Sequence, residues 1–150
     1  MRKTTKIAII VFAVAAIAGL VIWDAPRNRV ELLLERDAIE QAVKAYFKAE
    51  MEQNFKLVYT YLAPSSVYRK KHSYQDFLND VGNSPVRIKS YRIVDIYRLR
   101  NNDNRETYPF VDKFVQVEVD VDIGYSNTGV NSTYNYCFTF LKEYGVWYKG

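Results

Sequence analysis

The stretch FVQVEVDVDIGY, residues 114–125, has the most regular pattern in the chain. Apolar and polar residues alternate along it with a period of two, which predicts a β-strand with one face on a core and the other in water. Such one-sided burial is typical of antiparallel sheets. The inward set is Val115, Val117, Val119, Val121, Ile123 and Tyr125, and the outward set is Gln116, Glu118, Asp120 and Asp122.

Strands are expected on both sides of this stretch. Residues 86–100 (VRIKSYRIVDIYRLR) begin with the same alternation, but its phase becomes ambiguous around residues 90–92, which indicates a β-bulge or a sharp bend. Residues 133–142 (TYNYCFTFLK) alternate again, and their four aromatic residues share the inward face. A turn at residues 143–145 then leads to a short closing strand, residues 146–148. The second half of the chain therefore predicts an antiparallel sheet.

Helical periodicity precedes the sheet. Apolar residues recur every three or four positions from about Val30 to Gln53, which predicts a long amphipathic helix. Shorter helices are expected within residues 54–66 and residues 73–82. The expected capping residues are Asn54, the capping-box pair Ser73 and Asp76, and Gly82 just after the last turn. Three helices followed by a bent antiparallel sheet predict an α+β fold.

This order of elements resembles the nuclear-transport-factor-2-like superfamily, the cystatin-like α+β roll that includes SnoaL-like and ketosteroid-isomerase-like domains. The resemblance is carried by NFKLVYTYLAPSS (54–66), SYQDFLNDVGNSPVRI (73–88) and the terminal FTFLKEYGVWYKG (138–150), and it covers about residues 36–150. It implies a curved sheet that wraps the long helix into a cone with a pocket at its mouth. Because members include enzymes, ligand binders and interaction modules, the fold does not select a function.

An uncharged run, IAIIVFAVAAIAGLVIW, occupies residues 7–23. As a helix it would span about 26 Å, against a hydrocarbon core of about 30 Å, so a short transmembrane anchor is the favoured interpretation. A cleaved signal peptide, with Ala16-Ile17-Ala18 as its cleavage site, and a buried core helix are the alternatives. The predicted organisation is a cytoplasmic tail (1–6), the anchor (7–23), a connector (24–35) in which Pro26 ends the membrane helix, and the α+β domain (36–150).

Basic residues gather at the N-terminus. Arg2, Lys3 and Lys6 precede the run, and the remainder of the chain holds eighteen Lys and Arg against seventeen Asp and Glu. The positive-inside bias therefore predicts a cytoplasmic N-terminus and a domain on the outer side of a bacterial membrane. The near-neutral domain argues against nucleic-acid binding. One cysteine and one histidine cannot supply the usual four ligands of a structural zinc site, so no metal is expected. No cofactor is expected either.

Two sets of side chains are candidate functional residues. Tyrosines and a tryptophan on the inward faces either fill the core or line a pocket for an apolar or aromatic ligand, and the candidates are Tyr46, Tyr134, Tyr136 and Trp147. Asp95 is the candidate catalytic base of a pocket enzyme. One strand phase places Asp95 on the inward face with Ile93 and Tyr97, whereas the other places Val94 and Ile96 inside and Asp95 in water.

Three leucines in the connector, Leu32, Leu33 and Leu34, either add packing against the sheet or contact a partner helix or the membrane surface. Three functions remain open. The preferred one is a non-catalytic, membrane-anchored outer domain that binds a protein partner or a small apolar ligand. The second is an assembly component of a type IV secretion or conjugation apparatus, in which the leucines form a homo-oligomer contact. The third is a pocket enzyme of the isomerase or hydrolase kind that uses Asp95.

Overall fold

The computed structural model describes residues 17, 18 and 24–150 of the chain. Two compact units meet in the sequence between Leu34 and Glu35, and the second unit carries the fold described below. The predicted anchor, residues 7–23, lies outside the described residues apart from Ile17 and Ala18. No helix in the described part of the chain has both the length and the apolar character needed to cross a membrane.

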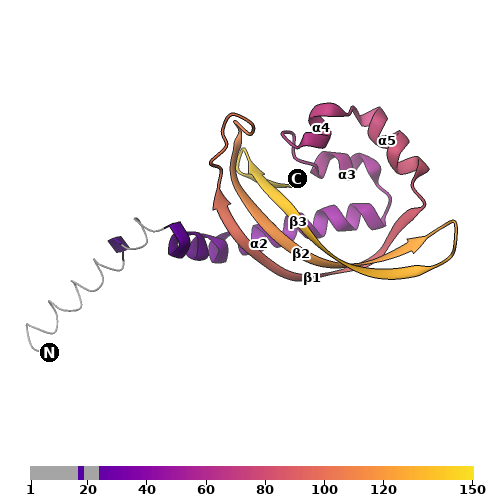
Figure 1. The fold of residues 1–150 in the computed structure, drawn as a ribbon, viewed down its shortest axis with the longest axis horizontal. Coiled ribbons are helices and arrows are strands. Elements are labelled where there is room, and N and C mark those ends of the chain that lie inside the picture. The colour runs from indigo at the N-terminus through magenta and orange to yellow at the C-terminus, as the bar shows by residue number, and fades with distance from the viewer. Residues whose placement is uncertain (1–16, 19–23) are drawn as a thin grey trace, which may run out of the picture. The chain divides into compact units, whose positions relative to one another are not determined.

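The fold is α+β, with helices packed on a four-stranded antiparallel sheet (Figure 1). The strands follow one another as hairpins in the order β1 (Val86–Asn101), β2 (Val111–Tyr125), β3 (Asn131–Glu143) and β4 (Val146–Lys149). The alternation predicted for residues 114–125 is confirmed in β2, where every second residue from Val115 to Ile123 is buried. The predicted final turn is also confirmed, since Tyr144 and Gly145 have φ values of 51° and 79°, as a tight hairpin requires.

The first strand is irregular. Its pairing with β2 shifts between Ile88 and Ser90, again between Ile93 and Asp95, and a third time further along the strand. The expected irregularity is therefore present, on both sides of residues 90–92 rather than within them. Each extra residue increases local twist and bends the strand. Figure 1 shows the resulting sheet curving around the helices.

Within residues 24–150, four helices precede the sheet: α2 (Asp24–Met51), α3 (Phe55–Tyr61), α4 (Val67–Lys71) and α5 (Tyr74–Asn83). Asn54 caps α3 and Ser73 forms the predicted capping box with Asp76 at α5. One sequence prediction was wrong and one helix was missed. Gly82 lies within α5 rather than after it, and α4, capped by Ser66, was not predicted. The connector was expected to merge into the long helix, and the structure has one helix from Asp24 to Met51, which includes Pro26. The predicted end of a membrane helix before Pro26 lies outside the described residues.

The main core lies between the sheet and α2. Phe47 is its centre, because its ring stacks on Tyr91 of β1 with centroids 4.8 Å apart and meets Phe138 of β3 edge-on at 5.5 Å. The face of α2 that carries Phe47 also buries Ile39 and Val43. Below, this side of the sheet is called the helix-facing side, and the opposite side is called the outer side. The strand residues buried on the helix-facing side include Ile96, Val115, Val117, Val119, Val121, Ile123 and Phe140.

A smaller core covers the other side of the sheet at the end where β2 begins and β3 finishes. Ala63, Val111, Phe114 and Leu141 are buried there together, with Tyr108 and Tyr148 packed against them. Both sides of the sheet are therefore covered at this end, which explains why the neighbours Phe114 and Val115 are both buried.

Candidate ligand-binding site

The aromatic row of β3, defined as Tyr134, Tyr136, Phe138 and Phe140, lies on the helix-facing side of the sheet. Each member pairs with a buried valine of β2, from Val121 opposite Tyr134 to Val115 opposite Phe140. Burial falls off along the row. Phe140 is buried, whereas Tyr134 and Tyr136 are 39% and 40% exposed. Their rings are 5.9 Å apart, so the core side of β3 continues into an open aromatic surface.

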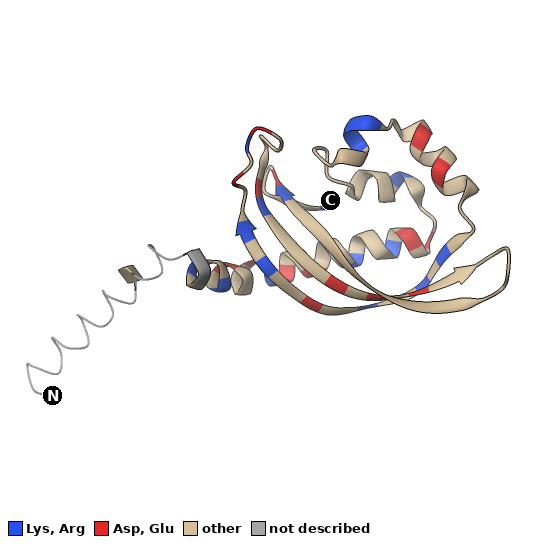
Figure 2. Cartoon of the chain, in the orientation of Figure 1, with Lys and Arg blue, Asp and Glu red and all other residues tan. Residues whose placement is uncertain are grey.

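The opposite side of the same strand is polar and has its hydrogen bonds satisfied. Thr133 donates to Asp122 at 2.6 Å, Asn135 donates to Asp120 at 2.8 Å, and Arg92 of β1 forms an ion pair with Asp120. Hydrogen bonds from Asn135 and Arg92 lower the pKa of Asp120 despite some desolvation. Acidic and basic positions are interspersed along the long strands (Figure 2). This part of the outer side is therefore a polar surface, and the exposed aromatic rings of β3, Tyr134 and Tyr136, are on the helix-facing side.

Tyr46 of α2 is buried on the helix-facing side. Its hydroxyl donates to Oε1 of Glu50, one turn along the same helix, at 2.6 Å. Burial, followed by the neighbouring Glu50 carboxylate, raises the pKa of Tyr46 well above its ordinary value. The ring of Tyr46 therefore packs in the core, and its hydroxyl holds one oxygen of the Glu50 carboxylate in place.

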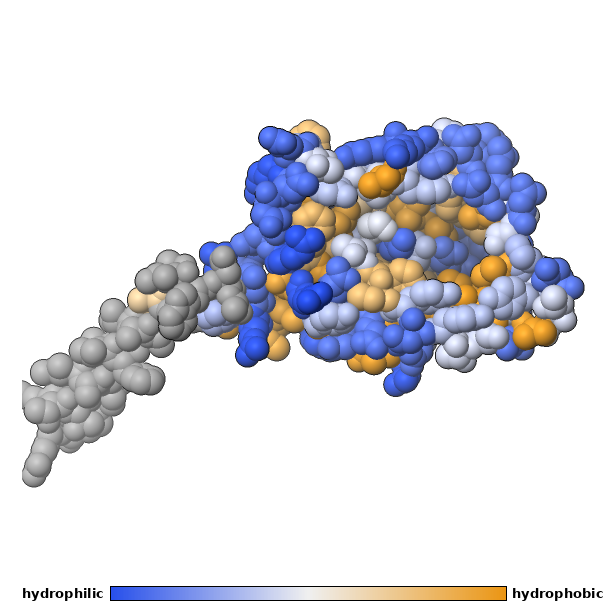
Figure 3. Space-filling view, viewed as in Figure 1, coloured by the Kyte–Doolittle hydropathy of each residue, from blue (hydrophilic) through white to orange (hydrophobic). Residues whose placement is uncertain are grey.

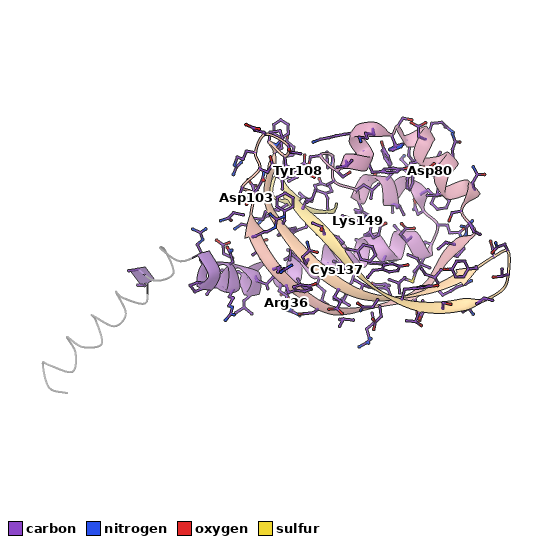
Figure 4. All side chains as sticks on the ribbon, in the orientation of Figure 1. Arg36, Asp80, Asp103, Tyr108, Cys137 and Lys149 are labelled. Atoms are coloured by element: carbon purple, nitrogen blue, oxygen red, sulfur yellow. The ribbon has the colours of Figure 1, made fainter. Side chains whose placement is uncertain are left out.

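Lys149, the last residue of β4, brings a positive charge to the aromatic row. It pairs with Phe140, and its Nζ lies 5.6 Å from the ring centroid of Phe138. Figure 4 shows Lys149 between the sheet and the helices. Burial lowers the pKa of Lys149 from its ordinary value, and the negative charge of Glu50 partly opposes that effect. Among the described residues, none is within hydrogen-bond or ion-pair distance of this ammonium.

A pocket of about 240 Å³ opens beside Glu50, between the end of α2, α3, α5 and the start of β1. Figure 3 shows apolar residues in a hollow rimmed by polar ones. Arg87 is the only basic residue of this lining, and its Nη1 donates hydrogen bonds to the carbonyl oxygens of Ser84 and Val86. The lining consists of Glu50, Gln53, Phe55, Val81, Ser84, Val86, Arg87 and Ile88.

Trp147 does not lie with the other predicted pocket residues. It pairs with Lys142, six positions along β3 from Tyr136, which corresponds to about 20 Å along a strand. Its indole N–H donates to Oε2 of Glu35 at 3.0 Å, and Lys142 forms an ion pair with the same carboxylate. Trp147 instead lines a separate groove of about 520 Å³ between α2, α3 and β4.

Asp95 is on the outer side of the sheet. The shift between Ile93 and Asp95 leaves Val94 unpaired, so Ile96 is buried while Asp95 is exposed opposite Glu118. The Asp95 carboxylate accepts a hydrogen bond from the backbone N–H of Ile96 at 2.8 Å. Neither of the two uninterrupted phases left open by the sequence is present: Ile93 and Ile96 both pair with buried valines of β2, Val94 is exposed, and Asp95 lies away from the helix-facing side.

The connector leucines are largely exposed. Leu33 and Leu34 of α2 are 74% and 80% exposed, and Leu32 is half-buried. Their side chains are therefore accessible to another molecule in this structure.

Sequence reasoning missed Lys149 and Glu50. The available signal was the phase of the last strand, because Lys149 follows Trp147 by two positions and so shares its face. Within residues 24–150, no group of three or more His, Cys, Asp and Glu side chains is arranged to hold a metal ion. No protein-family model and no curated protein matches the chain.

Proposed function

We propose that this chain is a membrane-tethered domain on the extracytoplasmic side of a bacterial membrane. On this proposal it binds a small apolar ligand through the aromatic row of β3. The observation that carries the proposal is the exposure of Tyr134 and Tyr136 on the side of the sheet that elsewhere forms the core. When an apolar surface covers aromatic rings that are exposed to water beside a core, the free energy of the system falls.

The contrast between the two sides of β3 supports this proposal. Thr133 and Asn135 hydrogen bond to the carboxylates of β2 and present a polar surface. Tyr134 and Tyr136 alternate with them along the strand. Of these two hydroxyls, only that of Tyr134 has a hydrogen bond to another described residue, which it accepts from the Tyr125 hydroxyl at 3.1 Å. Their rings provide an apolar surface, and the pocket of about 240 Å³ beside Glu50 has a lining that is half apolar and half polar.

The tether and its orientation rest on the sequence. Residues 7–23 are uncharged and long enough for a short span, and the three basic residues before them favour a cytoplasmic N-terminus. The domain that follows is, on this proposal, a cone-shaped roll of the nuclear-transport-factor-2-like kind. Its ligand face is open to the outer compartment.

The experiment is calorimetric titration of the full chain in lipid nanodiscs with 4-phenylbutyramide, a neutral apolar probe, with empty nanodiscs as the blank. We expect saturable binding that weakens about 3- to 10-fold in Tyr136→Ser, because the lost ring contact is worth roughly 0.5 to 1.5 kcal/mol. Asn135→Ser, one residue away on the outer side, is the matched control and should bind the probe like the wild type. Absence of saturable binding to the wild type would overturn the proposal.

A second candidate function has its own observation. The groove of about 520 Å³ beside β4 is lined on its α2 side by Ala38, Gln41, Ala42 and Ala45, and small residues at helical spacing let another helix approach closely. The occupant on this hypothesis is a second copy of the chain, as in an assembly component of a type IV secretion or conjugation apparatus. Crosslinking in native membranes should then yield a defined multimer that Ala42→Arg abolishes and Lys44→Arg, on the exposed side of α2, does not. A monomer in the wild type would exclude it.

A further inference from the structure

We infer that the ligand of the aromatic row is a monocarboxylate with an apolar body, and that its carboxylate is bound by the ammonium group of Lys149. This inference rests on the proposed ligand-binding function and adds the chemical class of the ligand. Three relationships support it: the position of Lys149, the absence of a hydrogen-bond acceptor for its ammonium among the described residues, and the charges around it.

The position of Lys149 indicates where the polar group of the ligand lies. The Nζ lies 5.6 Å from the ring centroid of Phe138, and the rings of Phe138, Tyr136 and Tyr134 follow one another at 5.7 Å and 5.9 Å. A molecule covering the exposed rings would therefore reach the ammonium with one end only. That arrangement fits a ligand with an apolar body and a single terminal polar group.

The absence of a hydrogen-bond acceptor for Lys149 indicates the charge of the ligand's polar group. An ammonium has three N–H donors and no acceptor, so the half-buried Lys149 can donate to an oxygen of a bound molecule. Among the described residues, Lys149 has the face of Phe138 and the more distant charge of Glu50, but no hydrogen-bonding oxygen. A ligand oxygen at this position would supply the acceptor, and a carboxylate would supply it with a compensating charge.

The surrounding charges limit the ligand to one negative charge. Glu50 is held by the Tyr46 hydroxyl and is not within ion-pair distance of Lys149, so its negative charge remains near the site. Arg87, the basic residue of the neighbouring pocket, already donates to two backbone carbonyl oxygens. A dianion such as a phosphate monoester would meet one cation and one carboxylate. A monocarboxylate matches the single ammonium.

The test compares 4-phenylbutyrate with 4-phenylbutyramide, its neutral isostere, by calorimetric titration of the full chain in lipid nanodiscs near pH 7. We expect the acid to bind the wild type at least 10-fold more tightly than the amide, because a charge-assisted hydrogen bond is worth about 1.5 to 3 kcal/mol. Lys149→Met should bind both probes with equal affinity, and Lys149→Arg should keep the preference for the acid. Lys56→Met, which removes an exposed lysine of α3, is the matched control and should behave like the wild type.

The outcomes separate the two proposals. Equal affinity of the wild type for acid and amide overturns the carboxylate inference and leaves the apolar-ligand function standing. Saturable binding of neither probe overturns the function itself. Because the wild-type comparison needs no variant, a Lys149→Met chain that fails to fold, judged by near-ultraviolet circular dichroism, does not decide the result. A preference for the acid that survives in a folded Lys149→Met chain also overturns the inference.

Discussion

Glu35 of α2 accepts a hydrogen bond from the indole N–H of Trp147 at 3.0 Å and so connects the long helix to the last strand, 112 positions away in the sequence. The second oxygen of the same carboxylate forms an ion pair with Lys142. β4 has only four residues, and these contacts of Trp147 and Lys142 with Glu35 join the end of the sheet to α2.

Replacing Glu35 by Gln should lower the free energy of unfolding by about 1 to 2 kcal/mol. Gln can still accept the Trp147 N–H, but the charge-assisted bond with Lys142 is lost, and such bonds are about twice as strong as neutral ones. Urea unfolding of the full chain in nanodiscs, followed by Trp fluorescence, measures the change. The matched control is Glu52→Gln, whose carboxylate lies 3.8 Å from Lys48 on the surface and should cost under about 0.5 kcal/mol. Equal losses in the two variants would contradict the assigned role of Glu35.

The same carboxylate should make stability depend on pH in the acid range. The hydrogen bond from Lys142, supported by that from Trp147, lowers the pKa of Glu35 below its ordinary value although burial opposes them. The unfolded chain therefore binds this proton at higher pH than the folded chain, so the contribution is present above the unfolded pKa of about 4.3 and is lost as pH falls through the folded pKa. Urea midpoints measured from about pH 6 to pH 3 should fall less steeply in Glu35→Gln than in the wild type. Parallel profiles would refute this.

A buried carboxylate elsewhere depends on a single serine. Glu143 is almost fully buried, and its Oε2 accepts from the backbone N–H of Ser65 at 3.1 Å and from the Ser65 hydroxyl at 2.8 Å. Ser65→Ala removes one of these donors from a buried charge, which should cost about 1 to 3 kcal/mol of unfolding free energy. In a double-mutant cycle, the same change should cost less in a Glu143→Gln background. Ser132→Ala on β3 is the control, and additive losses in the cycle would show that the pair is not coupled.

The sequence was most informative where one structural period continued without interruption. The alternation of residues 114–125 predicted β2 and its buried face, and Ser73 with Asp76 predicted the start of α5. The helix α4 was missed because five residues are too few for a periodic apolar signal, and only the Ser66 cap marks it. The residue types indicated which helices and strands form, but not which parts of the helix-facing side of the sheet remain exposed to water.

The candidate site was therefore predicted only in part. Tyr134 and Tyr136 were placed on the inward face correctly, but how far α2 covers that face depends on tertiary packing, and the separation of Trp147 from the tyrosines depends on it too. The side occupied by Asp95 was undecidable because a single unpaired residue, Val94, reverses the phase of the strand.

Asp95→Asn should leave stability and ligand binding essentially unchanged. Asp95 is exposed on the outer side opposite Glu118, so removing its charge relieves a like-charge pair and should raise the unfolding free energy by no more than about 0.5 kcal/mol. Asp120→Asn is the contrasting variant, because Asp120 interacts with Arg92 and Asn135, and its loss should destabilise the sheet. Urea unfolding and titration with 4-phenylbutyramide measure both effects. Weaker probe binding in Asp95→Asn would restore the pocket-enzyme hypothesis.

Cys137 can report the side of the membrane on which the domain lies. It is the one cysteine of the chain and is exposed on β3, with its sulfur 2.9 Å from Gln116 Oε1 (Figure 4). If the domain is outside, a membrane-impermeant maleimide should label Cys137 in intact spheroplasts as fully as in lysed ones, as a gel shift or mass spectrum can show. Cys137→Ser should give no adduct, and a cytoplasmic protein with an exposed cysteine should be labelled only after lysis. Because labelling needs only access to the thiol, adduct formation restricted to lysed spheroplasts would place the domain inside and remove the proposed orientation, whatever the ligand experiments show.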